Sequence, residues 1–352
     1  MAFGPFRTLP LGATLHWSRA APVDARGIAV AALGMTVPVL AGLALGRAEL
    51  GFTIGLGAML LAGGPDSPTQ ERPSPASAIL PAALALTTAT AIAGFAWADP
   101  VMILLAGAAA AISGYSRPVG VAAVRFIIYL VLSATLLEGA GSHRGGAALA
   151  FGLGALWNVA IRFLLVPRRA PAMPPAQPAR TPTPPQRRAH WRRTLRDLAG
   201  WQFPIRIVAG LGAASVLRHL WPSHHFGWIV LTVALLTQRP IEQLPVKTVQ
   251  RALGTALGVA LTWAILTSTT APVLLGAAIC LLATLAPIAR ARSYLAWSTI
   301  STPVILLVID LGRPVETALL VDRLVATLCG AAIVLSGNAA LDRLTRRAAP
   351  GI

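Results

Sequence analysis

An arginine, a threonine and a glycine recur at positions i, i+4 and i+7 in two stretches of the sequence: Arg251, Thr255 and Gly258, then Arg323, Thr327 and Gly330. This spacing places all three side chains on one face of a helix. A guanidinium group can hold an anionic group through two parallel hydrogen bonds, and a hydroxyl on the same face can add a contact. The pattern therefore fits a path or binding site for anions.

The same residues also have a purely structural interpretation. Gly254 and Gly258 are spaced as in a seam where two helices pack closely, and we expect these glycines and Gly330 to act in packing. Arg251 fits an anion-binding side chain and equally a snorkelling anchor at the edge of a membrane. Both interpretations of Arg251 stay open at this point.

Asp322 stands directly before Arg323. If their helix begins near Glu316, both charges lie inside it, where membrane charges are costly and tend to face cavities or one another. Asp322 is then a candidate proton carrier, because a carboxyl group in apolar surroundings can hold a proton. If the helix begins at Asp322 itself, the two residues form only its outer cap.

Four further residues complete the candidate substrate path: Arg125, Thr302, Trp228 and Trp297. Arg125 interrupts an apolar run, Thr302 precedes the proline that kinks its helix, and the two tryptophans offer stacking surfaces. His224 and His225 read as loop residues, and nothing nearby completes a metal site. We expect no enzyme activity and no cofactor, because phosphate-binding loops, nucleophile elbows and paired His-Glu motifs are missing from the sequence.

The amino-acid composition indicates that these residues lie in a membrane protein. Of 352 residues, 55% are hydrophobic and only 12% are charged, with a mean hydropathy of +0.69; a soluble domain carries about 25% charged residues. The apolar residues form runs long enough for spanning helices, about twelve in all. The predicted helices are 27–46, 49–64, 78–97, 100–115, 119–137, 145–166, 203–221, 225–238, 248–268, 271–289, 293–310 and 316–340. Several are short, which suggests tilt or shielding by neighbouring helices.

We predict an all-α polytopic membrane protein whose chain divides into a six-helix half, a Pro/Arg-rich cytoplasmic linker, a second six-helix half and a basic cytoplasmic tail: residues 1–167, 168–200, 201–342 and 343–352. The end of the linker, around Trp191 to Trp201, fits a short amphipathic helix on the membrane face. Asn158 and Asn338 stand at equivalent places near the ends of the two halves, which indicates parallel repeats related by an axis along the membrane normal.

The net charge of +17 is explained by the distribution of basic residues across the membrane and does not indicate nucleic-acid binding. With both termini in the cytoplasm, the segments between helices that face outside hold only Arg47, Arg144, Arg218 and Arg313. Most other basic residues fall on the inside, as the positive-inside rule requires.

The chain resembles the fusaric acid resistance family, also called the aromatic acid exporter family, most clearly from Arg206 to Asn338. The matching residues are Trp228, Thr232, Pro240, Thr248, Arg251, Gly254, Thr255, Gly258, Tyr294, Thr302, Pro303, Arg323, Thr327 and Gly330. The first half matches in helix pattern but has no counterpart of the Arg251 motif. The resemblance implies a multi-pass protein of the bacterial inner membrane, with efflux of aromatic carboxylic acids and a distant relation to plant malate channels.

The function predicted from residues and resemblance together is gradient-driven efflux of small organic acids, because no nucleotide site is present. A passive organic-anion channel and a non-transporting membrane scaffold are the alternatives. The expected partners are the lipid bilayer and a small organic anion, with a second copy of the chain or a periplasmic adaptor as further candidates. Nucleic acid is not an expected partner.

Overall fold

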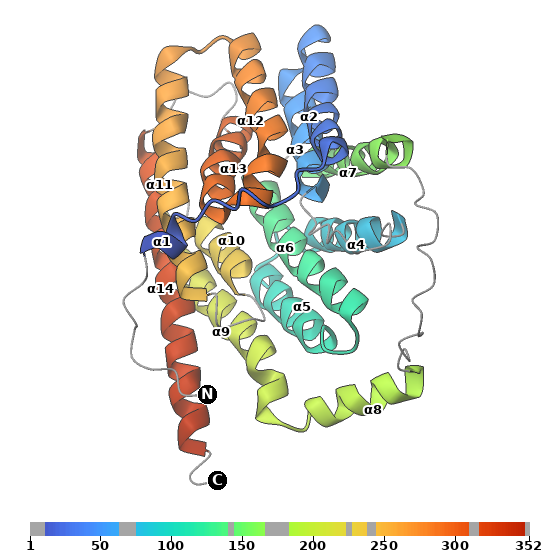
Figure 1. Cartoon of the computed structure of the whole chain (residues 1–352), viewed down its shortest axis with the longest axis vertical. Helices are drawn as coiled ribbons and strands as arrows, with labels where there is room; N and C mark the ends of the chain where they lie inside the picture. The colour runs from blue at the N-terminus through green and yellow to red at the C-terminus, as the bar shows by residue number, and fades with distance from the viewer. Residues whose placement is uncertain are drawn as a thin grey trace.

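The structure is a computed structural model that describes residues 11–62, 75–139, 144–165, 183–222, 227–237, 244–309 and 317–348. Within these ranges all regular structure is helical (Figure 1). The predicted all-α class is therefore confirmed. The linker residues 168–182, His224, His225, Pro240 and Arg313 lie outside the described residues.

The first part of the chain contains a short helix followed by six apolar ones: α1 (Leu11–Thr14), α2 (Ala25–Ala44), α3 (Ala48–Ala62), α4 (Pro75–Ile92), α5 (Ala98–Ile112), α6 (Arg117–Gly139) and α7 (Arg144–Leu165). The second part contains α8 (Pro184–Thr194), α9 (Leu198–Leu220), α10 (Gly227–Leu236), α11 (Leu244–Ser268), α12 (Pro272–Arg292), α13 (Tyr294–Ile309) and α14 (Thr317–Ala348). Each predicted apolar helix has a counterpart, with boundaries within five residues except at the end of α14. This helix continues to Ala348, into the segment predicted as a basic tail, and α1 was not predicted.

Seven of the described helices are long and apolar enough to cross a membrane. They are Ala25–Ala44, Arg117–Leu137, Arg144–Leu165, Gly200–Leu220, Pro245–Ser268, Pro272–Arg292 and Thr317–Leu341. The other apolar helices are shorter, between 10 and 17 residues. Long spans of this kind make the chain a membrane protein, because about 20 apolar residues are needed to cross a bilayer.

The helix α10 is apolar all round, and this composition explains its central position. Nearly all its side chains are buried, from Trp228 to Leu236, and α6, α9, α11 and α14 pack around it. A helix without a polar face has no side to present to water. One continuous hydrophobic core runs from Met35 in α2 to Val334 in α14 and so joins both parts of the chain.

The predicted surface helix around Trp191 to Trp201 is placed differently in the structure. Helix α8 ends at Thr194, and α9 already begins at Leu198. The earlier start of α8 has a local cause: Pro184 suits the first turn, and the Gln186 side chain accepts a hydrogen bond from the Thr183 N–H at 2.9 Å. Trp191 at the end of α8 donates to the carbonyl of Ala111 at 3.0 Å, which fixes α8 against α5.

Several contacts join the helices before the linker to those after it, and the two most extensive are α2 on α12 and α5 on α9. At the second contact, Asp99 of α5 accepts hydrogen bonds from Ser215 and Arg218 of α9. The ring Nδ1 of His219 lies 3.7 Å from the same carboxylate. An ion pair with a half-buried carboxylate therefore reinforces the apolar contact.

The predicted packing glycines lie where two helices approach closely. A methyl group added at Gly254 would lie 2.6 Å from Cβ of Ser298, and one at Gly258 would lie 2.7 Å from Cβ of Thr302, both on α13. At Gly330, the added carbon would lie 2.8 Å from Cβ of Thr232 on α10. These separations are too short for real carbon atoms, so the helices α11 and α14 reach their neighbours only through glycine.

We predict that Gly258→Ala lowers the melting temperature of the purified protein, measured by the loss of monodisperse protein on heating in detergent. The added carbon would also lie 2.8 Å from the backbone carbonyl of Thr299, which cannot rotate away, and such overpacking costs about 1–3 kcal/mol. Gly212→Ala is the control, because nothing lies within 4 Å of a Cβ there. Equal melting temperatures for the two variants would contradict the packing role of Gly258.

Candidate functional site

Four helices of the second part, α10, α11, α13 and α14, bring two arginines into the interior. Arg251 is 1% exposed and Arg323 is 0% exposed, and they are the largest of the fully buried side chains in the described residues. The glycine contacts explain this placement, because they pull α11 against α13 and α14 against α10 with both arginines on the contacting face. A buried arginine is rare unless it is paired.

Arg323 has an aromatic neighbour and no hydrogen-bond acceptor. Its guanidinium carbon lies 4.0 Å from the centre of the Trp228 ring, a cation–π contact worth roughly 2 kcal/mol when desolvated. None of the nitrogens Nε, Nη1 and Nη2 has a hydrogen-bond partner within the part of the chain that the structure describes. An arginine presents five N–H donors, so this side chain lacks the acceptor that its burial requires.

Arg251 occupies a similar place against the other tryptophan. Its guanidinium carbon lies 5.8 Å from the centre of the Trp297 ring, and the carbon of Arg290 lies 5.5 Å from the same ring. The Nε of Arg251 also has no partner among the described residues. Arg251 is close enough to Arg323 for the two positive charges to repel each other. Since Arg251 is inside the bundle, the snorkelling interpretation is not supported by its position.

Helices α9–α11 and α12–α14 form two three-helix units, and the two arginine–tryptophan pairs join one unit to the other. In each unit a tryptophan helix precedes an arginine helix, α10 before α11 and α13 before α14. Each arginine contacts the tryptophan of the other unit, Arg251 with Trp297 and Arg323 with Trp228. Figure 1 shows α11 and α14 running in opposite directions, as expected for repeats of an odd number of helices.

The threonines of the predicted path divide into two groups. The hydroxyl of Thr302 donates to the carbonyl of Ser298 at 2.9 Å, and that of Thr327 donates to the carbonyl of Arg323 at 2.9 Å. Their protons are thus used within their own helices. By contrast, Oγ1 of Thr255 and Oγ1 of Thr232 are buried without a hydrogen-bond partner among the described residues. Thr255 and Thr232 are therefore the hydroxyls that can donate to an anion.

Arg125 of α6 contributes a positive charge from the first part of the chain. It lies half-buried, and its charge acts on the buried Tyr129 one turn along the helix, together with those of Arg290 and Arg162. Arg290 also contacts Trp297. The positive potential thus continues from Arg251 through Arg290 to Arg125. Sequence analysis did not select Tyr129 and Arg290, because neither belongs to a repeated spacing.

Asp322 lies inside α14, which begins at Thr317, and its side chain is only 6% exposed. The structure therefore matches the alternative in which Asp322 and Arg323 are part of the helix rather than its cap. As neighbours in sequence on a helix, the two side chains leave the axis in different directions. The carboxylate accordingly does not neutralise Arg323, none of whose nitrogens has a hydrogen-bond partner among the residues that the structure describes.

The segment from Thr14 to Ser18, which precedes α2, contacts α11, which carries Arg251, and the neighbouring helix α12. This contact was not predicted from the sequence. The Gln250 side chain donates to the carbonyl of Thr14 at 3.0 Å, and Thr14 is 2% exposed. The Ser18 N–H donates to the carbonyl of Arg292 at 2.9 Å, and the Arg292 guanidinium lies 5.7 Å from the Trp17 ring. The segment therefore lies across the ends of α11 and α12, beside Arg251.

We predict that Arg323→Met leaves the melting temperature unchanged or raises it. A buried charge without an acceptor costs several kcal/mol, and Met fills a similar volume without that cost. Arg206→Met is the matched comparison, because Arg206 is also buried but donates to Asn338 at 3.1 Å and to the Gln202 carbonyl at 3.2 Å. We expect Arg206→Met to lower the melting temperature. Destabilisation by Arg323→Met as large as that by Arg206→Met would show that Arg323 is structural.

A scan against family models finds the fusaric acid resistance protein-like family at residues 210–337. Searches among curated proteins and among solved structures give no match. The matched range contains α10 to α13 and most of α14, and with them both arginine–tryptophan pairs. The resemblance found in the sequence is thus confirmed: residues 210–337 of this membrane protein match the fusaric acid resistance protein-like family.

Proposed function

We propose that this chain exports small organic acids, with aromatic carboxylates as the substrate class, across the bacterial inner membrane. The observation that supports the proposal is the fully buried Arg323, whose three guanidinium nitrogens have no acceptor among the described residues. A carboxylate supplies the missing acceptors, because its two oxygens accept two parallel N–H bonds from one guanidinium.

The aromatic part of the substrate is argued from the surroundings of the two arginines. Trp228 and Trp297 lie beside them, and the remaining walls of the site come from the apolar core. One face of Trp228 is occupied by Arg323, so a ring would pack on the edge of Trp228 or on Trp297. Thr232 and Thr255 supply hydroxyl donors for the second carboxylate oxygen.

Twelve spanning helices in two parallel six-helix repeats form the architecture that we propose for the transporter. Equivalent packing supports the repeat: α3–α7 and α4–α6 in the first half correspond to α10–α14 and α11–α13 in the second. The two most extensive contacts between the halves, α2–α12 and α5–α9, also exchange under this correspondence. Among the short helices, α10 lies at the centre of the bundle, where α6, α9, α11 and α14 shield it.

Both termini and the linker lie in the cytoplasm in this proposal, because the basic residues gather in the segments on that side. Export against a gradient then needs a coupled ion, and Asp322 is the proposed proton carrier. Its carboxyl group is buried next to Arg323 in sequence, so protonation there changes the charge near the substrate site. The same buried arginines also suit a passive anion channel, in which no ion is coupled to the movement of the substrate.

We predict that cells producing the protein accumulate less radiolabelled benzoate than cells without it, and that an uncoupler abolishes the difference. Arg323→Met should abolish export. Arg323→Lys should retain little export activity, because an ammonium group cannot bind a carboxylate through two parallel hydrogen bonds as the planar guanidinium does. Asp322→Asn should abolish coupled export while leaving downhill flux.

Membrane levels of each variant are the control for insertion. Benzoate export that is unaffected by Arg323→Met would remove Arg323 from the site and favour a scaffold role. Export that persists with the uncoupler, together with an anion current in planar bilayers, would favour a channel.

A further inference from the structure

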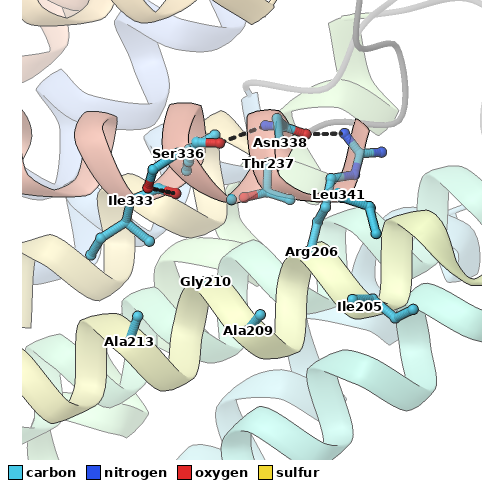
Figure 2. Close-up of a pocket in the computed structure, with 12 residues that line it drawn as sticks. Ile205, Arg206, Ala209, Gly210, Ala213, Thr237, Ile333, Ser336, Asn338 and Leu341 are labelled. Atoms are coloured by element: carbon cyan, nitrogen blue, oxygen red, sulfur yellow. Dashed lines mark hydrogen bonds between the residues drawn. The ribbon is translucent and has the colours of Figure 1, made fainter. Parts of the chain in front are cut away.

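A groove between α9 and α14 lies away from the arginine–tryptophan pairs and has no role so far. Its volume is about 210 Å³, and it is lined by residues of α9 and α14 and by Thr237, which directly follows α10: Ile205, Arg206, Ala209, Gly210, Ala213, Thr237, Ile333, Val334, Ser336, Gly337, Asn338 and Leu341. Figure 2 shows Ala209 and Ala213 on the α9 side, facing α14 across the groove. The groove is therefore a defined space between two membrane-spanning helices.

The groove continues the helix face that carries Arg323. From that residue the face runs along α14 in steps of four and three: Arg323, Thr327, Gly330, Val334, Gly337 and Leu341. The first three belong to the arginine site, and the last three line the groove. At 1.5 Å per residue, Gly337 lies about 20 Å along the helix from Arg323. Gly330 and Thr232, which pack together, separate the two regions.

The chemistry of the groove is that of a site for an amphiphile with an anionic head. At one end, Arg206 is only 7% exposed and reaches across to Asn338, as the dashed line in Figure 2 shows. The Thr237 and Ser336 hydroxyls lie in the same lining. The rest of the wall is apolar or small, including Ile205 and Ile333. A cation with amide and hydroxyl neighbours suits a carboxylate, and the apolar wall suits its hydrocarbon part.

The groove opens sideways, toward the membrane rather than toward the bundle centre. Ala209 and Ala213 are exposed on α9, and Ser336 and Gly337 are exposed on α14. Its polar end lies near the start of the span Gly200–Leu220 and near the end of the span Thr317–Leu341. In the proposed orientation this is the cytoplasmic end. An amphipathic acid in the inner leaflet has its carboxylate at that depth.

We propose that this groove is the entry site through which amphipathic carboxylates pass from the inner leaflet toward Arg323. The proposal rests on the proposed export function and names where the substrate is first bound. Arg206 and Asn338 hold the carboxylate, and the apolar wall holds the ring or chain. Arg206 thus keeps its structural bond to Asn338 and supplies the positive potential at the entrance.

Blocking the groove with one side chain tests this entry site. A Cβ at Gly337 meets nothing within 4 Å, so Gly337→Leu fills the groove without a clash. Gly212→Leu is the matched control, because that glycine is equally open on α9 but does not line the groove. In inside-out vesicles, Gly337→Leu should raise KM for 2-naphthoate roughly tenfold with kcat little changed, since it removes binding before the transport step. Unchanged KM in Gly337→Leu would overturn the entry site while leaving the export function in place.

A binding measurement tests the groove even if transport is not observed. Ala213→Cys, in a background with Cys280→Ser and Cys329→Ser, carries a bimane label in the purified protein. Spin-labelled stearate should quench the label, and 2-naphthoate should relieve the quenching; Gly337→Leu should weaken both effects. Absence of quenching by the stearate would exclude an amphiphile site. Quenching by spin-labelled phosphatidylglycerol that 2-naphthoate does not relieve would show a lipid site instead and overturn the proposal.

Discussion

A positive charge held inside an apolar bundle without an acceptor is the constraint on which the rest of this structure depends. Taking a guanidinium out of water costs several kcal/mol even after relaxation, and the aromatic face of Trp228 offsets only part of that cost. Arg323 remains buried because the glycine contacts of α14 with α10 place it there. In the proposed function, an anion supplies the missing acceptor and relieves the same cost.

The exchange between the two three-helix units explains why the arginines lie together. Each unit brings its tryptophan to the arginine of the other, and α11 packs on α14. The site therefore lies between the units, so that a small movement of one against the other would change both pairs at once. Repeats of this kind are the usual basis of alternating access in transporters. The packing of α2 on α12 and of α5 on α9 sets the frame in which such a movement takes place.

Much of the fold was predictable because apolar runs and their interruptions mark helices directly. The contacts of Gly254, Gly258 and Gly330 also followed from spacing, since one helix face is a local property. Other features depend on contacts between distant segments. The Gln250–Thr14 bond joins residues 236 positions apart, and no local pattern announces it. The tryptophan partners of Arg251 and Arg323 could not be predicted either. Each arginine contacts the tryptophan of the other three-helix unit, and the sequence of one unit alone does not indicate that contact. The start of α8 was misplaced because its capping residues precede the tryptophans that suggested it.

The central claim is that Arg323 provides a carboxylate site, and anion-dependent thermal stabilisation of the purified protein tests it most directly. A ligand that binds only the folded state raises the melting temperature in proportion to its affinity and concentration. We predict that benzoate raises the melting temperature of the wild-type protein, that neutral benzamide does not, and that Arg323→Met loses the response to benzoate. An equal response to benzoate in the wild-type and Arg323→Met proteins would contradict the account.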